Sequence, residues 1–140
     1  MSFKEVGIIS CGFPLVKSTY GKKEIDNNEE LMYAFMKANR DFTKTLLKDE
    51  ILAILGKNLS IYFYEKNKIP PEEEKGNGSL LGYAILKNGT NRKSEQEEEN
   101  IVKKLKLITS KFKDTYINPD HIEPSKYINF KLVIDMIFRR

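Results

Sequence analysis

The order in which hydrophobic periodicity changes along this chain constrains its fold more than any single residue does. The apolar residues first follow the pattern of two short strands, then that of a helix, then that of three strands and finally that of two helices. The order β-β-α-β-β-β-α-α predicts an α+β fold, in which a five-stranded antiparallel sheet carries helices packed on it and residues 1–140 form one domain.

The predicted strands form a hairpin followed by a meander. Gly12 and Pro14 favour a tight turn in the hairpin, and the stretch from Gly56 to Asn58 favours another in the meander. The predicted strands are residues 4–11, 15–20, 50–55, 59–64 and 79–86. Residues 66–78 contain two prolines and two glycines and have no periodicity, so we expect an exposed loop there.

The first predicted helix follows the hairpin. Asp26, Asn27 and Asn28 supply side-chain oxygens that can cap its first amides. Its apolar stripe, at spacings of three and four residues, comprises Leu31, Phe35, Ala38, Phe42 and Leu46, widened by Met32, Met36 and Leu47. We expect this stripe to be buried against the sheet.

Two further helices are predicted near the C-terminus. One begins near Ser94 with an acidic first turn and ends before Pro119, as the helix dipole and proline geometry favour. Its predicted buried stripe is Ile101, Leu105, Ile108 and Phe112, with Val102 and Tyr116. The other spans residues 125–138, with Tyr127, Phe130, Val133 or Ile134, and Ile137 facing inward and Leu132 and Met136 beside them.

Composition and charge limit the classes of protein to which the chain can belong. The single cysteine, Cys11, excludes an intramolecular disulfide and a cysteine zinc site within one chain. The apolar runs are far shorter than the roughly 20 residues of a membrane-spanning helix, and the charged N-terminus lacks a signal-peptide pattern, so we expect a cytoplasmic protein. The net charge of +4 is concentrated in residues 101–140, which carry nine basic and four acidic side chains.

The order of elements resembles that of the longin domain and, more distantly, the roadblock and profilin folds. The resemblance is carried by the hairpin at residues 7–16, the helix at 29–38, the meander at 51–86 and the two closing helices. It covers nearly the whole chain and rests on element order and apolar pattern rather than on an invariant motif. The lysine-, glutamate-, isoleucine- and asparagine-rich composition suits a stand-alone archaeal or other prokaryotic version.

The resemblance implies a non-enzymatic protein. Longin-domain proteins act in vesicle trafficking, as regulatory heads of SNAREs, as subunits of adaptor and tethering complexes and as platforms for small GTPases. Because no heptad repeat follows in this sequence, we expect a free-standing adaptor rather than a SNARE. The implied partner is a protein, either a small GTPase or another longin- or roadblock-like protein, and a homodimer is a further option.

Few residues offer catalytic or ligand chemistry. His121, the only histidine, lies beside Asp120 among turn-forming residues, which favours a structural or solvent-exposed role over a metal site or a catalytic triad. Cys11 is a candidate nucleophile at a strand end, although a small buried side chain is the simpler interpretation. Residues 76–78 lack phosphate-loop spacing, and the acidic runs lack calcium-loop spacing. The sequence therefore predicts no catalytic, metal-binding or cofactor-binding residue.

Aromatic and basic residues define a candidate interaction surface. Strand alternation places Tyr62 and Tyr64 on the face opposite to Leu59, Ile61 and Phe63. Tyr83 lies on the next predicted strand, and three lysines lie on the helix that follows; the lysines also fit a simple solvated helix face. The candidate surface comprises Tyr62, Tyr64, Tyr83, Lys103, Lys104 and Lys106.

Two alternatives to a protein-interaction scaffold remain open at this point. A sheet of this size with helical covers can enclose a pocket for a small ligand. The basic C-terminal third can instead attach the protein peripherally to an anionic membrane or bind it to nucleic acid.

Overall fold

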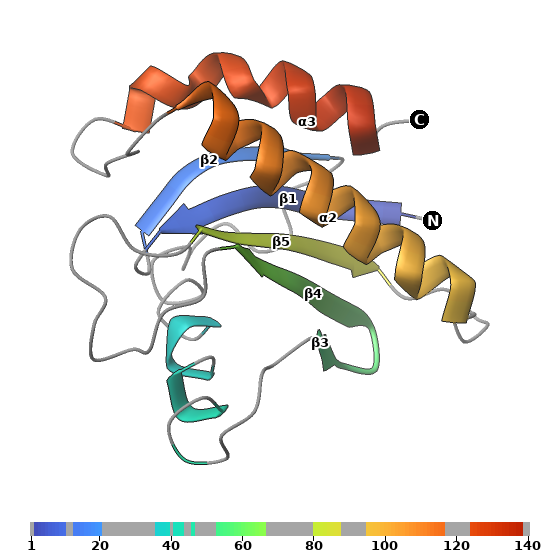
Figure 1. Cartoon of the computed structure of the whole chain (residues 1–140). Coiled ribbons are helices and arrows are strands. Elements are labelled where there is room, and N and C mark those ends of the chain that lie inside the picture. The colour runs from blue at the N-terminus through green and yellow to red at the C-terminus, as the bar shows by residue number, and fades with distance from the viewer. Residues whose placement is uncertain are drawn as a thin grey trace.

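The computed structural model shows an α+β fold, in which a five-stranded antiparallel sheet is packed with helices (Figure 1). The coarse fold predicted from the sequence is therefore confirmed. The residues that the structure describes are 2–10, 13–20, 36–39, 41–43, 46, 53–66, 80–87, 95–116 and 124–138.

The strands meet in the spatial order β2-β1-β5-β4-β3. Their bounds are Ser2–Ser10 (β1), Phe13–Thr19 (β2), Ala53–Leu55 (β3), Leu59–Lys66 (β4) and Leu80–Lys87 (β5). All neighbouring pairs are antiparallel. In this order β1 lies inside the sheet, between its hairpin partner β2 and strand β5. The predicted loop over residues 66–78 lies outside the described residues except for Lys66, which ends β4.

The pairing register brings residues from three strands together at Gly7. On β1, Gly7 pairs with Lys17 of β2 on one side and with Tyr83 of β5 on the other. A Cβ atom added at Gly7 would lie 2.7 Å from the Tyr83 hydroxyl and 2.7 Å from the Val16 carbonyl oxygen. Glycine is therefore required here because the Tyr83 ring occupies the space that a side chain would need.

Three helical elements pack on one face of the sheet (Figure 1): α2 (Glu95–Thr115), the 3₁₀ helix η2 (Pro124–Phe130) and α3 (Lys131–Phe138). The predicted buried stripe of α2 is confirmed, because its four principal residues are at most 1% exposed. These residues are Ile101, Leu105, Ile108 and Phe112. Glycine at position 82 on β5 lets α2 approach closely, since a Cβ there would lie 2.7 Å from Cγ2 of Thr109.

The last predicted helix differs from the structure in its first half. Residues 124–130 form a 3₁₀ helix, and only residues 131–138 are α-helical. Tyr127, Phe130 and Ile134 are buried as predicted, but Phe138 is buried and Ile137 is only partly so. A 3₁₀ helix has three residues per turn, so it shifts the phase of the apolar stripe relative to a continuous α-helix.

The helix predicted after the hairpin is described only in part, and its stripe needs a correction. Residues 36–39, 41–43 and 46 are helical, and Met36 is fully buried. The prediction that Ala38, Phe42 and Leu46 are buried is wrong, because Phe42 is 54% and Leu46 is 66% exposed and Ala38 is exposed as well. A helical period shows which residues share a side, but not how much of that side the sheet covers. Four predicted members lie outside the described residues: Leu31, Met32, Phe35 and Leu47.

The two faces of the sheet carry separate apolar cores. The larger core lies between the sheet and α2, η2 and α3, and it includes Tyr62 with Tyr64 packed against it. The smaller core lies on the opposite face, where Met36 packs with Phe63 and Tyr83. The predicted alternation along β4 is confirmed, because its tyrosines and Phe63 belong to different cores.

Candidate functional site

The three tyrosines predicted from the sequence do not form one surface. Tyr62 is 3% exposed and Tyr83 is fully buried, whereas Tyr64 is half-buried. Tyr62 and Tyr64 face the helices, and Tyr83 faces the opposite core. The reason is the register: Tyr83 pairs with Phe63, and directly paired residues share a face of the sheet. The expectation of one exposed tyrosine patch is therefore wrong. Tyr62 and Tyr83 are buried on opposite faces of the sheet, and Tyr64 is half-buried on the face of Tyr62.

Tyr62 is held beneath α2 in an environment that favours its neutral form. Burial is the main cause that raises the pKa of its phenol above the ordinary value. The nearby carboxylate of Glu98 raises the pKa further by charge repulsion with the phenolate and by accepting a hydrogen bond from the phenol. This contact joins the acidic first part of α2 to the sheet, which is a structural role.

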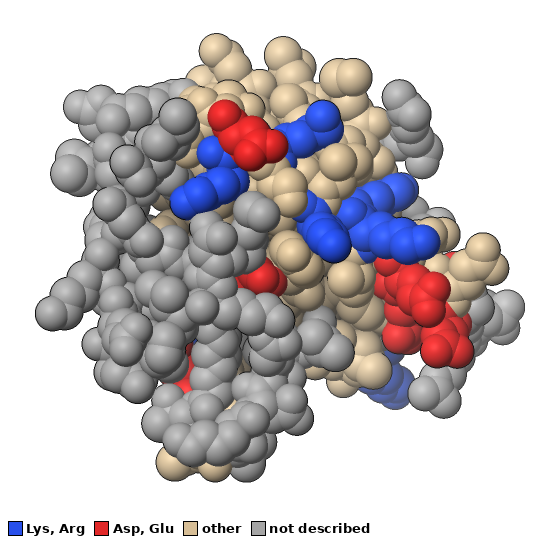
Figure 2. Space-filling model, viewed as in Figure 1, with Lys and Arg blue, Asp and Glu red and all other residues tan. Residues whose placement is uncertain are grey.

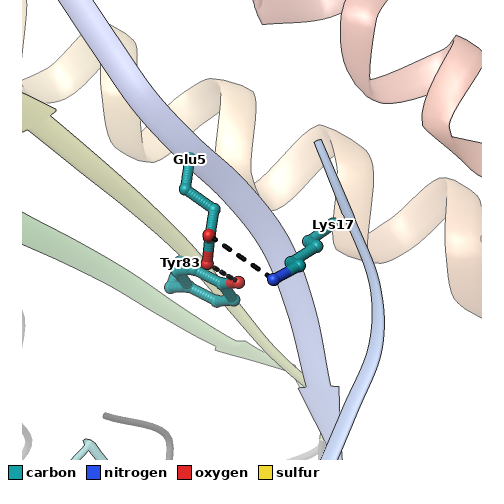
Figure 3. A network of polar contacts seen from close by, with 3 residues as sticks. All are labelled: Glu5, Lys17 and Tyr83. Carbon is teal, nitrogen blue, oxygen red and sulfur yellow. Dashed lines mark hydrogen bonds and ion pairs between the residues drawn. The ribbon is translucent and has the colours of Figure 1, made fainter. Parts of the chain in front are cut away.

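A polar network is buried on the opposite face of the sheet (Figure 3). The Tyr83 hydroxyl donates a 2.5 Å hydrogen bond to Oε2 of Glu5, and Nζ of Lys17 lies 3.9 Å from Oε1 of the same carboxylate. Glu5 is only 7% exposed. The network crosses three strands, and its members were not singled out as a group from the sequence because their proximity depends on register.

The described residues offer no metal cluster: none of them form a group of three or more His, Cys, Asp and Glu side chains suited to hold a metal ion. The two residues with the most reactive side chains, Cys11 and His121, lie outside the described part of the chain. In the Glu5–Lys17–Tyr83 network, Glu5 and Tyr83 are buried and Lys17 is partly exposed, which is consistent with a structural role.

The predicted lysines are on the outer side of α2. Lys103 and Lys106 are exposed, and Lys104 is partly buried. The ammonium group of Lys104 lies 5.8 Å from the ring centroid of Phe138 and 6.0 Å from that of Phe3, within reach of a cation–π attraction. Figure 2 shows basic side chains over the middle of α2 and acidic side chains at its N-terminal end. The lysines therefore lie at the surface, whereas Tyr62 and Tyr83 are buried and Tyr64 is half-buried.

A row of large apolar side chains is exposed on η2 and α3. Ile128 is 60%, Leu132 is 69% and Met136 is 63% exposed. Leu132 and Met136 are four residues apart on α3 and share one side of it, away from the buried Ile134 and Phe138, and Ile128 precedes them on η2. The apolar pattern of the sequence predicts Leu132 and Met136 beside the inward-facing residues and does not indicate their exposure.

The basic helix and the apolar row lie beside each other. The ring of Phe112 on α2 is 5.1 Å from the rings of Tyr127 and Phe130, while Lys104, two turns earlier, contacts Phe138. The C-terminal half of α2 therefore runs antiparallel to η2 and α3. Since these elements pack on the same face of the sheet, their exposed sides look outward together.

We call this outward surface the helix-layer face. It comprises the exposed residues Leu107, Lys111, Ile128, Leu132 and Met136 and the partly buried Lys104. Lys104, Leu107 and Lys111 share one side of α2 by their spacing, and the contact of Lys104 with Phe138 turns that side toward α3. The face thus combines an apolar row with a basic border.

Comparison of the chain with family models, with curated proteins and with solved structures gives no match in any of the three. Among the described residues, no helix has the length and apolar character that crossing a membrane requires. The helix-layer face therefore has to be interpreted from its own chemistry.

Proposed function

We propose that this protein is a non-catalytic interaction module that binds a protein partner through its helix-layer face. The observation that carries the proposal is the apolar row: three large side chains on η2 and α3, each more than half exposed. Burial of such a side chain is worth about 1.5–3 kcal/mol, and a row of them is typical of interaction sites rather than of ordinary surface.

The polar clusters support a role without catalysis. Glu5 and Tyr83, joined by a 2.5 Å hydrogen bond between β1 and β5, are less than a tenth exposed. Tyr62 and Glu98 join a helix to the sheet. In each case the polar groups contact each other within the fold, whereas the helix-layer face combines exposed apolar side chains with lysines.

The resemblance to longin domains suggests which partner to test first. A five-stranded antiparallel sheet with helices is the framework on which longin-domain adaptors are built, and it supports the expected role in trafficking or in small-GTPase regulation. We therefore take a small GTPase as the first candidate partner, with another longin- or roadblock-like chain or a second copy of this chain as the next.

Light scattering of the purified protein, alone and with small GTPases from the same organism in each nucleotide state, tests the proposal. We expect a complex whose dissociation constant rises about tenfold or more on Leu132→Asp, as for the central residue of an interface. The matched control is Leu55→Asp, because Leu55 is similarly exposed, at 64%, on strand β3. Equal effects of the two substitutions, or a monomer that binds no GTPase, would overturn the proposal.

A further inference from the structure

The proposed function leaves the chemistry of the partner open, and the helix-layer face defines it. We propose that the face binds an acidic amphipathic α-helix of a partner protein, laid along α3. The helix would place its apolar side on Ile128, Leu132 and Met136, and its carboxylates toward Lys104 and Lys111. This inference rests on the proposed function and adds the secondary structure and charge of the bound segment.

The geometry of the row suits a helix. From Ile128 on η2 to Met136 on α3 the row spans about 13 Å, at rises of about 2.0 Å per residue in the 3₁₀ helix and about 1.5 Å in the α-helix. An opposing helix presents apolar residues with the same spacing, which is how amphipathic helices are recognised by apolar surfaces. Leu107 on the neighbouring α2 is 44% exposed and extends the apolar area sideways, so a helix can contact both elements.

The charges beside the row select an acidic helix. From Lys103 to its end at Thr115, α2 carries five lysines and one acidic residue, the exposed Asp114, so this part of the helix has a net positive charge. Lys104 and Lys111 lie on the side of α2 that faces α3, and Lys131 adds an exposed cation at the start of α3. Carboxylates flanking the apolar side of a partner helix would complement these charges, whereas basic residues there would be repelled.

The same charges disfavour two other occupants. The first turn of α2 is acidic, with Glu95, Glu97 and Glu98 (Figure 2), so a flat anionic membrane lying along the whole helix would meet both signs of charge. A helix of about three turns covers only the basic part. A second copy docked face to face would bring the lysines of the two copies together, at an electrostatic cost.

Binding of synthetic helices, measured by fluorescence anisotropy, tests the inference. The probe is a labelled peptide of about 18 residues, long enough to form a helix, with leucines on one side and glutamates on both flanks. Its counterparts carry lysine in place of glutamate or serine in place of leucine. Vesicles of phosphatidylcholine with phosphatidylserine form a separate arm. The protein variants are Leu132→Asp, the double substitution Lys104→Glu and Lys111→Glu, and the control Leu55→Asp.

We expect the acidic peptide to bind at least about tenfold more tightly than the basic and serine peptides, and added salt to weaken it. Leu132→Asp should weaken binding about tenfold, the double lysine substitution should reverse the charge preference, and Leu55→Asp should have no effect.

Equal binding of acidic and basic peptides, lost on Leu132→Asp, would overturn the inference and leave the proposed function standing. Vesicle binding without peptide binding would overturn it in favour of a membrane surface. No binding in any arm, together with a GTPase complex insensitive to Leu132→Asp, would overturn both.

Discussion

At the scale of single residues, the Tyr83 hydroxyl shows how a buried polar group is stabilised in this sheet. It donates to the carboxylate of Glu5, which is only 7% exposed and lies near Lys17. A hydrogen bond to a charged group contributes more than one between neutral groups, and loss of a buried partner costs more than the bond itself. The contact therefore stabilises the pairing of β1 and β5.

We predict that Tyr83→Phe lowers the free energy of unfolding by about 1.5–3 kcal/mol, because the ring stays in place over Gly7 while the buried Glu5 carboxylate loses the hydrogen bond from the phenol. Urea denaturation followed by circular dichroism measures the change. Tyr64→Phe is the matched control, since Tyr64 is half-buried on the neighbouring strand β4. A similar loss in both variants would contradict the role of the Glu5 contact.

The raised pKa of Tyr62 leads us to expect that the stability of the protein falls at alkaline pH. Burial and Glu98 raise the pKa of its phenol above the unfolded value of about 10. A raised pKa in the folded state means that the stabilisation is fully present below pH about 10 and is lost as the pH rises through the folded pKa. We expect Tyr62→Phe to make the alkaline loss of stability shallower, measured as melting temperature against pH. An unchanged slope in Tyr62→Phe would contradict the assignment.

At the scale of the elements, the contact of α2 with β5 depends on Gly82. The nearest atom to an added Cβ is Cγ2 of Thr109, at 2.7 Å, and the next is the Leu105 carbonyl oxygen at 3.5 Å. Thr109 is fully buried, and its hydroxyl donates to backbone carbonyls of α2. One methyl group therefore limits how closely the helix and the strand pack.

We predict that Gly82→Ala destabilises the protein by about 1–3 kcal/mol, the usual cost of overpacking a core. Thr109→Ser removes the clashing methyl but keeps the hydroxyl, so the double variant should be less destabilised than the sum of the single variants. A double-mutant cycle from urea denaturation measures this coupling. Additive effects would show that the clash is with something other than the Thr109 methyl.

The elements also show what the sequence could predict. Strand alternation correctly separated Tyr62 and Tyr64 from Phe63, because a strand has a fixed period of two. It could not show that the tyrosine side is the covered one, since that depends on helices that come much later in the chain. It also could not show that Tyr83 shares the face of Phe63, because register arises from long-range pairing.

The outer row of α3 was missed for a local reason. Nine of the twelve residues from Tyr127 to Phe138 are apolar or aromatic, so the sequence leaves the inward side poorly defined. In the structure Ile134 and Phe138 are the buried residues of α3, which leaves Leu132 and Met136 on the outer side. The best candidate site therefore lies where the sequence pattern was weakest.

At the scale of the whole molecule, residues from the two ends of the chain pack against each other. The Tyr20 hydroxyl, just after β2, donates a 2.7 Å hydrogen bond to Oδ1 of Asp135 on α3. The ring of Phe3 meets that of Phe138 edge to face, with centroids 5.1 Å apart. The helical layer that carries the proposed binding face is therefore tied to the N-terminal hairpin, and we expect the two to unfold together.

We predict that the protein unfolds in one cooperative transition. Asp135→Asn should move the midpoint of this transition to lower urea without dividing it into two transitions. The substitution weakens the charged acceptor of Tyr20, and for this partly buried bond we expect a loss of about 1 kcal/mol. Far-ultraviolet circular dichroism reports the helices and tyrosine fluorescence reports the core; coincident urea curves indicate two-state unfolding. Asp114→Asn is the control, because Asp114 is exposed on α2. If the helical signal of Asp135→Asn were lost at lower urea than the fluorescence signal, α3 would unfold separately from the sheet. The binding face would then be fully folded only when its partner is bound.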